Sequence, residues 1–275
     1  MTPALLQAEA LQAHFPGGPP VLAGASVSLH PGERLALLGA NGSGKTTLLR
    51  CLSGAMAAQS GQVLVDGSPL RHDKAALRAH RARVQLVLQN PDDQLFSADV
   101  TQDVSFGPLN LGLDEATVRQ RVADSLALLG IEHLAERPTH QLSYGERKRV
   151  VIAGAVAMRP EVLLLDEPTA GLDPAGVTEL LDALARLRTA ILLATHEVDL
   201  AFAWADRVAV VADHQVREGG IELLGEEDLL ARARLRPPWQ VQMMRCAGLT
   251  LEGTLPRTAA QVAARLGISA AGTTG

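Results

Sequence analysis

The chain has 275 residues, of which 47% are hydrophobic and 20% are charged, so a globular fold with a sizeable core is expected. Lys and Arg number 25 against 30 Asp and Glu, and this acidic balance disfavours nucleic acid as a partner. The two cysteines, Cys51 and Cys246, lie far apart and lack metal-ligand spacing, which favours a reducing, cytosolic environment.

The sequence predicts no membrane-spanning segment. The longest uncharged apolar stretches, such as residues 150–158, have about half the length that a transmembrane helix requires. The N-terminus lacks a basic region and carries Glu9, so it does not resemble a secretory signal. We expect a soluble chain, and any membrane process that it serves requires another protein that crosses the bilayer.

In the first third of the chain, short strands predict a small antiparallel β unit attached to a parallel core. Residues 5–14 alternate loosely between apolar and polar side chains and predict an edge strand. A turn rich in Gly and Pro over 15–20 leads into a second predicted strand, 21–29. Further strands are predicted over 35–38 and 62–65.

The middle of the chain is predicted to be helical. A short helix over 75–83 and a buried strand over 84–88 come first, and strand signals are then absent until residue 160. Helices are predicted over 101–110, 115–129 and 143–158. We interpret residues 90–160 as a helical subdomain inserted in an α/β domain.

The α/β pattern resumes after this insertion. Strands are predicted over 162–166, 191–195 and 208–211, and helices over 174–187 and 198–204. Strands that alternate with helices through short loops predict a mostly parallel sheet covered on both faces.

From residue 226 the pattern changes to short helices. Residues 236–239 read as a linker, and Thr258 is a candidate N-cap for a helix over 259–266. We expect residues 270–275 to be frayed. The chain is therefore divided into an α/β domain, 1–225, and a helical C-terminal extension, 226–275.

Residues 39–47, GANGSGKTT, fit the phosphate-binding pattern G-x-x-x-x-G-K-[ST] between a predicted strand and a predicted helix. Because Gly42 and Gly44 carry no side chain, backbone N–H groups can turn inward around phosphate oxygens, and the helix N-terminus adds positive potential. Lys45 is expected to reach the β- and γ-phosphates and the Thr46 hydroxyl to ligate Mg²⁺. An accidental glycine-rich turn is the alternative. The predicted nucleoside-triphosphate site contains Gly39, Asn41, Gly42, Ser43, Gly44, Lys45, Thr46 and Thr47.

Two carboxylates follow the apolar run of the predicted strand 162–166. Asp166 and Glu167 place negative charge at the carboxyl edge of the sheet, where phosphate loops also lie. Asp166 is expected to hold Mg²⁺, directly or through water, and Glu167 to polarise the attacking water. The alternative is a pair of solvated acids at a strand end, and the neighbouring phosphate loop favours the first interpretation.

The stretch LSYGE over 142–146 predicts the start of a helix. Ser143 and Glu146 match the S-x-x-E capping box. A capped helix start is also an anion site, and Gly145 leaves room for an anion beside the backbone. Taken alone, the stretch indicates only that a helix begins there.

In their order along the chain, GANGSGKTT, Gln89, LSYGE, LLLDEP, Asp173 and His196 resemble the ATP-binding-cassette (ABC) ATPase family over about residues 5–225. The resemblance implies a P-loop NTPase core with a RecA-like mixed sheet. It implies that Gln89 contacts Mg²⁺ and senses a transmembrane partner, and that the Asp173 loop is the D-loop. His196 would contact the γ-phosphate.

The resemblance also assigns an adenine-stacking role to Phe15, for which a phenylalanine at the edge of the core is the alternative. LSYGE would be the signature motif, usually written LSGGQ. Tyr144 replaces its first glycine and Glu146 its glutamine, whereas Ser143 and Gly145 are kept. We expect activity to survive these two departures.

The mechanism that the resemblance implies needs two copies of the chain, arranged head to tail as a homodimer. ATP would lie between the phosphate loop of one copy and Ser143 and Gly145 of the other. Glu167 would act as the base, while His196 positions the γ-phosphate and Lys45 with Mg²⁺ neutralises developing charge. ATP-driven closure of the dimer would push on a membrane partner.

Residues 89–96, QNPDDQLF, and 106–113, FGPLNLGL, resemble the cobalt and nickel group of energy-coupling-factor transporter ATPases. The resemblance implies an importer subunit on the cytoplasmic face of the membrane, with transmembrane coupling and substrate-binding proteins as partners. Leu95 and Phe96 beside Asp92 and Asp93 predict an acidic and apolar surface for a basic coupling helix; ordinary packing is the alternative.

The sequence does not determine the transported substrate. An ATPase for a vitamin or other solute importer fits the same motifs, and so does a soluble ABC ATPase without a transport role. The acidic balance and the single cassette disfavour a role in DNA repair or translation.

Overall fold

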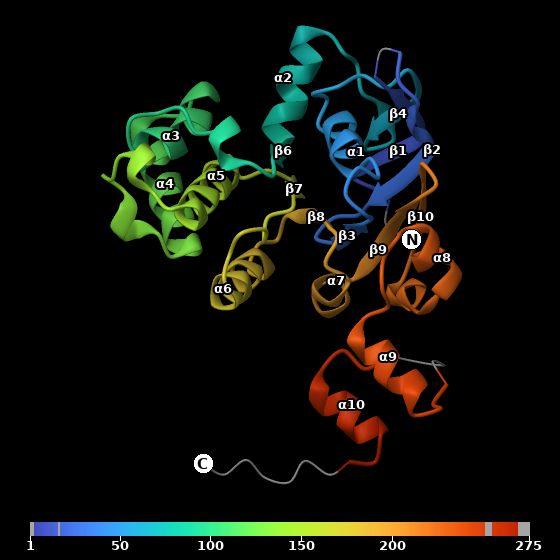
Figure 1. The fold of residues 1–275 in the computed structure, drawn as a ribbon. Coiled ribbons are helices and arrows are strands. Elements are labelled where there is room, and N and C mark those ends of the chain that lie inside the picture. The colour runs from blue at the N-terminus through green and yellow to red at the C-terminus, as the bar shows by residue number, and fades with distance from the viewer. Residues whose placement is uncertain (1–2, 16, 251–254, 269–275) are drawn as a thin grey trace, which may run out of the picture.

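Two β-sheets organise the chain, for which a computed structural model describes residues 3–15, 17–250 and 255–268 (Figure 1). The larger sheet has six strands in the order β10-β9-β3-β8-β7-β6. They are β3 (Arg34–Leu38), β6 (Val84–Val87), β7 (Val162–Asp166), β8 (Ala190–Thr195), β9 (Arg207–Ala212) and β10 (Gln215–Gly219). All neighbours run parallel except β10, which pairs antiparallel with β9. The mixed sheet confirms the predicted α/β class.

The smaller sheet is antiparallel and has the order β2-β1-β4-β5. Its strands are β1 (Leu6–His14), β2 (Pro20–Leu29), β4 (Ser60–Val65) and β5 (Ser68–Pro69). The prediction that residues 5–14 form an edge strand is wrong, because β1 lies between β2 and β4 and pairs with both. The loose alternation instead reflects a bulge, where the register shifts between Ala8 and Leu11 and Ala10 has a φ of 48°.

Strand β10 was not predicted from the sequence. A two-residue turn joins it to β9, and both turn residues, Asp213 and His214, have positive φ values of 50° and 65°. Turns of this kind usually contain Gly or Asn, so this one left no clear signal. The strand is polar and incompletely buried, which removed the apolar signal as well.

Helix α1 (Lys45–Leu52) packs between the two sheets and follows the phosphate-binding stretch, where a helix is predicted. Its Leu48, Leu49 and Cys51 are buried in one core with residues of β1, β2 and β3. Burial raises the pKa of the Cys51 thiol to about 11. From α2 (Lys74–Arg83), the buried His80 places Nε2 2.8 Å from the Leu52 carbonyl oxygen, so α2 supports the end of α1.

The helices between residues 90 and 160 form a lobe beside the larger sheet (Figure 1). It contains α3 (Val100–Asn110), α4 (Glu115–Leu129) and α5 (Tyr144–Ala157), close to their predicted bounds. Side chains of Asp99, Asp114 and Ser143 cap the three helices. The lobe shares one hydrophobic core with β7, β8, α6 (Pro174–Ala185) and α7 (Val198–Trp204).

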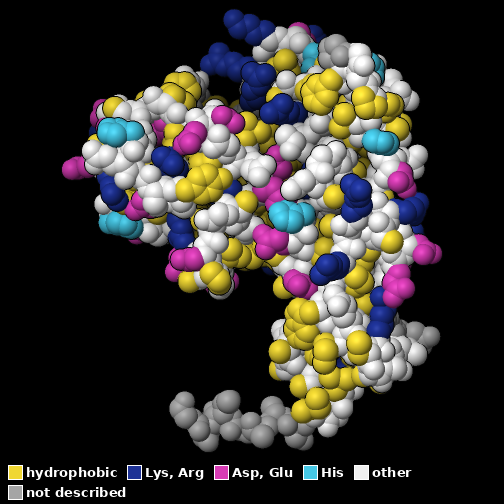
Figure 2. All heavy atoms as spheres, in the orientation of Figure 1, with side chains coloured by type: hydrophobic (Ala, Val, Ile, Leu, Met, Phe, Trp, Pro, Cys, Tyr) yellow, Lys and Arg dark blue, Asp and Glu magenta, His cyan; other side chains and the backbone are white. Residues whose placement is uncertain are grey.

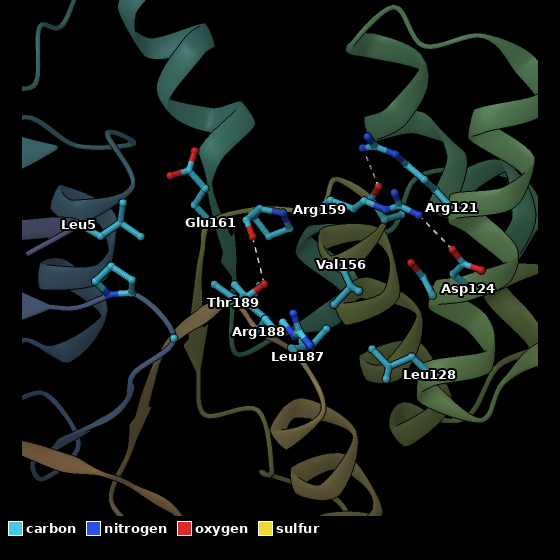
Figure 3. Close-up of a pocket in the computed structure, with 16 residues that line it drawn as sticks. Leu5, Arg121, Asp124, Leu128, Val156, Arg159, Glu161, Leu187, Arg188 and Thr189 are labelled. Atoms are coloured by element: carbon cyan, nitrogen blue, oxygen red, sulfur yellow. Dashed lines mark hydrogen bonds and ion pairs between the residues drawn. The ribbon is translucent and has the colours of Figure 1, made fainter. Parts of the chain in front are cut away.

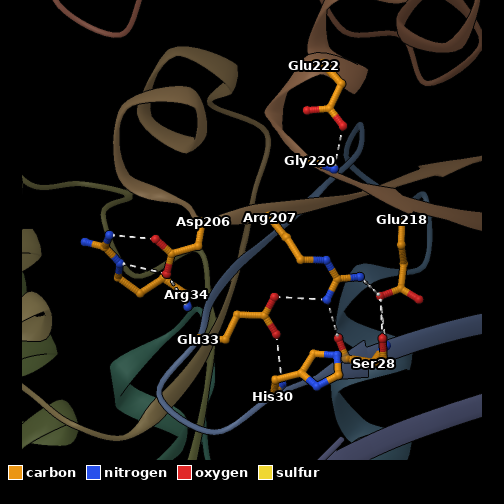
Figure 4. Close-up of polar contacts among 9 residues, drawn as sticks. All are labelled: Ser28, His30, Glu33, Arg34, Asp206, Arg207, Glu218, Gly220 and Glu222. Carbon is orange, nitrogen blue, oxygen red and sulfur yellow. Dashed lines mark hydrogen bonds and ion pairs between the residues drawn. The ribbon is translucent and has the colours of Figure 1, made fainter. Parts of the chain in front are cut away.

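A group of partly buried ion pairs joins the two sheets (Figure 4). Arg207 on β9 contacts Glu33 at 2.9 Å and Glu218 on β10 at 3.0 Å. Glu218 also accepts hydrogen bonds from the backbone N–H and the hydroxyl of Ser28 on β2, at 2.9 and 3.0 Å. Through one carboxylate, the unpredicted strand β10 is therefore tied to both the parallel and the antiparallel sheet.

The C-terminal extension contains α8 (Glu227–Arg232), α9 (Trp239–Cys246) and α10 (Ala259–Arg265). Thr258 forms a capping box with Gln261 at the start of α10, as the sequence indicates. The linker predicted over 236–239 ends one residue early, because Trp239 opens α9. Figure 1 shows α9 and α10 below the two sheets, and Cys246 is exposed there. The segment predicted to be frayed, 270–275, lies outside the described residues.

Within the described part of the chain, no helix combines the length and the apolar character that crossing a bilayer requires.

Candidate functional site

The predicted site residues gather at the carboxyl ends of adjacent strands in the larger sheet. The phosphate loop connects β3 to α1, Asp166 ends β7 with Glu167 directly after it, and His196 follows β8. Because β3, β8 and β7 are neighbours and run parallel, their carboxyl ends meet at one edge. This is the edge at which open α/β sheets bind ligands.

The shape of the phosphate loop depends on its glycines. Gly44 has a φ of 107°, and a Cβ there would lie 3.0 Å from the Val21 carbonyl oxygen, so neither the backbone conformation nor the space suits another residue. Gly42 has a φ of 80° and open space around it, into which a ligand can approach the backbone. Lys45 Nζ folds back onto the loop and donates to Gly39 O at 2.8 Å and Ala40 O at 3.3 Å.

A network of polar and ionisable side chains, centred on the buried Glu167, lies against this loop. Lys45 Nζ is 3.4 Å from Glu167 Oε1, and His196 Nδ1 is 3.0 Å from the same oxygen. The Thr46 hydroxyl donates to Asp166 Oδ2 at 2.6 Å. Glu167 holds a backbone φ of 46°, which non-glycine residues adopt rarely and which often marks a functional position.

These residues line a cavity of about 460 Å³, within the range of small-molecule sites. The structure brings ten of the predicted residues together there: Phe15, Asn41, Gly42, Gly44, Lys45, Thr46, Thr47, Gln89, Asp166 and Glu167. Phe15 is 55% exposed, so its ring is free to stack on a flat ligand.

Five predicted residues do not line this cavity. Gly39 and Ser43 belong to the loop but face each other, since a Cβ on Gly39 would come within 2.5 Å of the Ser43 hydroxyl. His196 lines an adjacent hollow of about 540 Å³ together with Asn41, Arg234 and Arg236. Ser143 and Gly145 stand at the start of α5 and line neither space.

The acidic groups fit a hard divalent cation. Burial raises the pKa of Asp166, because its charged form is poorly solvated there, and a nearby cation would relieve that cost. Glu167 Oε2 is buried without a hydrogen-bond partner, so it has a free acceptor site. Hydroxyl and carboxylate oxygens of Thr46 and Asp166 are the ligand type that Mg²⁺ prefers.

Two further residues, which sequence reasoning missed or left unexplained, meet the segment that follows β7. The Tyr144 hydroxyl donates to Gln89 O at 3.3 Å, and its ring packs against Gly171. Lys148 is only 1% exposed, and its Nζ donates to the carbonyl oxygens of Glu167 and Ala170. No sequence signal singles out Lys148, because it lies beside Arg147 and Arg149 in the charged first half of α5.

A larger cavity, of about 680 Å³, lies at the opposite edge of the same sheet (Figure 3). It lies between α4, α5 and the segments that precede β3, β7 and β8, and none of the predicted site residues lines it. Its acidic groups are already paired: Asp124 with Arg159 at 3.1 Å and Glu161 with Arg83 at 2.6 Å. Size alone therefore does not identify the functional site.

Comparisons with known proteins agree with this geometry. The ABC transporter family profile matches residues 22–170. The cobalt import ATP-binding protein CbiO of Rhodobacter capsulatus is 50% identical over 275 residues, covering 97% of this chain and 98% of that protein. The energy-coupling factor transporter ATP-binding protein EcfA of Methanosphaera stadtmanae is 41% identical over 244 residues, covering 87% and 88%.

Among solved structures, cbiO1 of Clostridium perfringens, described as part of the ABC transporter complex cbiONQ, is 40% identical with a TM-score of 0.75. The match covers 88% of this chain and 99% of that one. The sheet order, the phosphate loop and these identities lead to one conclusion. The chain belongs to the ABC transporter family, as an ATP-binding subunit of the energy-coupling-factor type whose ATPase activity is coupled to transport.

Proposed function

We propose that the 460 Å³ cavity binds ATP with Mg²⁺ and that Glu167, Lys45 and His196 carry out its hydrolysis. The observation that carries this proposal is the convergence of Lys45 and His196 on a single Glu167 oxygen, beside the phosphate loop. The unpartnered second oxygen of Glu167 is then available to accept a hydrogen bond from the attacking water.

Each residue around the cavity has a separate role in the proposed hydrolysis. Lys45 exchanges its contacts with the loop carbonyls for the β- and γ-phosphates, which leaves Glu167 free to accept the proton of water. His196, exposed and hydrogen-bonded to Glu167, orients the γ-phosphate. Thr46, Asp166 and Gln89 would hold Mg²⁺, which supplies charge neutralisation at the phosphates. Phe15 stacks on adenine at the mouth of the cavity.

We further propose that Ser143 and Gly145 act on the nucleotide of a second copy, in a head-to-tail homodimer. They do not line the cavity of their own chain, yet the capped N-terminus of α5 that they occupy suits an anion. Hydrophobic side chains also gather over α9 and α10 (Figure 2). Trp239, Met243 and Ile268 are 38%, 46% and 59% exposed, and this surface is our candidate for additional contact between copies.

A groove of about 630 Å³ between α2, α3 and α5 is our candidate for the membrane partner. Phe96 and Phe106 are 62% and 49% exposed, and their rings meet edge to face at 4.5 Å. The groove differs from the acidic and apolar surface expected from the sequence, because the cations of α2, which gather at one end of Figure 2, form one wall. They are Lys74, Arg78 and Arg81.

The carboxylate of the groove, Asp103, accepts hydrogen bonds from the backbone N–H groups of Phe96 and Ser97, at 3.1 and 3.0 Å. It is therefore used to hold the loop before α3 in place rather than presented to a basic partner. We propose that an apolar docking element, with polar groups of both signs at its ends, fills the groove and holds the chain on the cytoplasmic face of the membrane.

The cargo that we propose is cobalt or nickel, because a cobalt import ATP-binding protein aligns with nearly the whole chain. A vitamin or another solute is the second candidate, since the name of the related EcfA protein specifies no transported metal. Recognition of the cargo would fall to a substrate-binding membrane protein.

The test is co-expression with candidate membrane components, copurification, and uptake of ⁵⁷Co²⁺ and ⁶³Ni²⁺ into proteoliposomes. ATP-dependent uptake by the wild type and none by Glu167→Gln supports the proposal. A complex that hydrolyses ATP and transports a vitamin but neither metal would establish the second candidate. A chain that remains soluble and copurifies with no membrane protein would contradict both.

A further inference from the structure

Lys148 is a cation enclosed in the protein interior. It lies on α5, close to the residues proposed to meet the second copy, and it is 1% exposed. A buried ammonium group is unfavourable unless several acceptors replace water. Burial lowers the pKa of Lys148 to about 8, although the carboxylates of Glu167 and Asp166 favour the charged form. Because burying this charged group costs free energy, we expect specific hydrogen-bond partners around it.

Those partners belong to the segment that carries the proposed base. Lys148 Nζ donates to Glu167 O at 2.6 Å and to Ala170 O at 3.2 Å. The two carbonyls lie at the two ends of a tight turn, in which Ala170 N also donates to Glu167 O at 3.2 Å. One ammonium group therefore fixes the turn in which Glu167 adopts its positive φ.

Tyr144 also contacts this ammonium group. Its ring lies 5.5 Å from Lys148 Nζ, within the range of a cation–π contact. The same ring packs on Gly171, where any Cβ would come within 2.7 Å of it. Its hydroxyl reaches Gln89 O. The aromatic residue that replaces the usual signature glycine thus joins α5 to Gln89 and to the turn after β7.

We propose that Lys148 and Tyr144 are positioning residues, forming a clamp that makes the Glu167–Gly171 turn and the N-terminus of α5 move as one body. This inference rests on the proposed head-to-tail dimer. In that dimer Glu167 acts on the nucleotide of its own chain, whereas Ser143 contacts the nucleotide of the partner. The clamp would therefore couple the two ATP sites, so that closure at one prepares the base of the other.

The experiment measures ATP turnover against ATP concentration for Lys148→Met, Lys148→Arg and wild type, with the melting temperature of each. Lys148→Met should lower kcat by about 10–100-fold, leave KM for ATP within about threefold, and lower the Hill coefficient toward one. Lys148→Arg keeps the charge and should restore most of both values. Arg119→Met, on the solvent-facing side of α4 with its side chain 68% exposed, is the matched control and should change neither.

Tyr144→Ala provides a second test of the clamp if Lys148→Met fails to fold. Loss of the ring should lower kcat and the Hill coefficient in the same direction, whereas Tyr144→Phe, which loses only the hydroxyl, should have a smaller effect. Wild-type kcat and cooperativity in Lys148→Met or Tyr144→Ala would overturn the clamp, and so would a Lys148→Arg variant as impaired as Lys148→Met. The proposed function fails separately, if Glu167→Gln keeps wild-type turnover.

Discussion

The two edges of the six-stranded sheet each carry a cavity, and the contrast between them shows how function is recognised in this chain. The cavity at the amino edge is larger, about 680 against 460 Å³, but its carboxylates are paired with arginines. At the carboxyl edge, Lys45 and His196 both contact one carboxylate oxygen of Glu167, whereas its other oxygen has no hydrogen-bond partner. The backbone of Glu167 also has a positive φ. Incomplete pairing, rather than volume, distinguishes the reactive edge.

The largest effect on ATP turnover should follow from a substitution of Glu167 at the carboxyl edge. Glu167→Gln removes the proton acceptor but keeps the size of the side chain, so turnover should fall by about 10²–10⁴-fold while ATP still binds. Steady-state hydrolysis and equilibrium binding of a fluorescent ATP analogue measure the two quantities. Near-normal hydrolysis would show that another group is the base.

A smaller effect is expected at the mouth of the same cavity. Phe15→Ala should weaken ATP affinity by about tenfold, because stacking of a base on an aromatic ring contributes about 1–3 kcal/mol. Phe15→Trp should keep most of the affinity, and competition binding with ATP measures both. Equal ATP affinity in wild type and Phe15→Ala would contradict adenine stacking and favour the alternative, that Phe15 packs at the edge of the core.

The stability that His80 provides at the end of α1, the helix that follows the phosphate loop, should depend on pH. Burial lowers the pKa of His80 from its ordinary value of 6.5, so the unfolded chain takes up a proton at this residue more readily than the folded one. The contribution of His80 to stability is complete above pH 6.5 and is lost as the pH falls toward the lowered folded-state pKa, by at most about 1.4 kcal/mol per pH unit.

Urea denaturation at pH 7.5 and 5.5 tests this expectation. The loss of unfolding free energy between the two should be smaller in His80→Gln than in wild type. His133→Gln, at an exposed position, should lose as much as wild type. An unchanged loss in His80→Gln would mean that other groups account for the acid sensitivity.

The smallest effect is expected at the amino edge. Arg159→Gln breaks only the pair with Asp124, whose side chains are 58% and 49% exposed, so stability should change by less than about 1 kcal/mol. ATP turnover should stay within about twofold of wild type. A large loss of turnover would erase the contrast between the two edges.

Sequence reasoning succeeded where local chemistry determines structure. The phosphate loop, the capped helix at Ser143 and the apolar strand ending at Asp166 each carry their signal within a few residues, and each lies where it was expected. The antiparallel β unit and the helical insertion followed from hydrophobic periodicity together with turn signals.

What the sequence did not show depends on contacts between distant residues. That Lys148 meets Glu167 and Ala170 requires the packing of α5 against β7, which no pattern within α5 reveals. The position of β1 between two strands depends on pairing with β4, far along the chain. Strand β10 pairs with β9 through its backbone, and its Glu218 contacts Arg207 and Ser28. Neither contact can be recognised from the sequence of the strand itself.

The two cysteines give the protein a built-in labelling site. Cys51 is 1% exposed within α1, and its raised pKa leaves almost no thiolate at neutral pH, so it should resist maleimides. Cys246 is exposed at the end of α9. Wild-type protein can therefore take one spin label or fluorophore per chain in its C-terminal extension, and the label-to-label distance would report how the two tails approach when ATP is added.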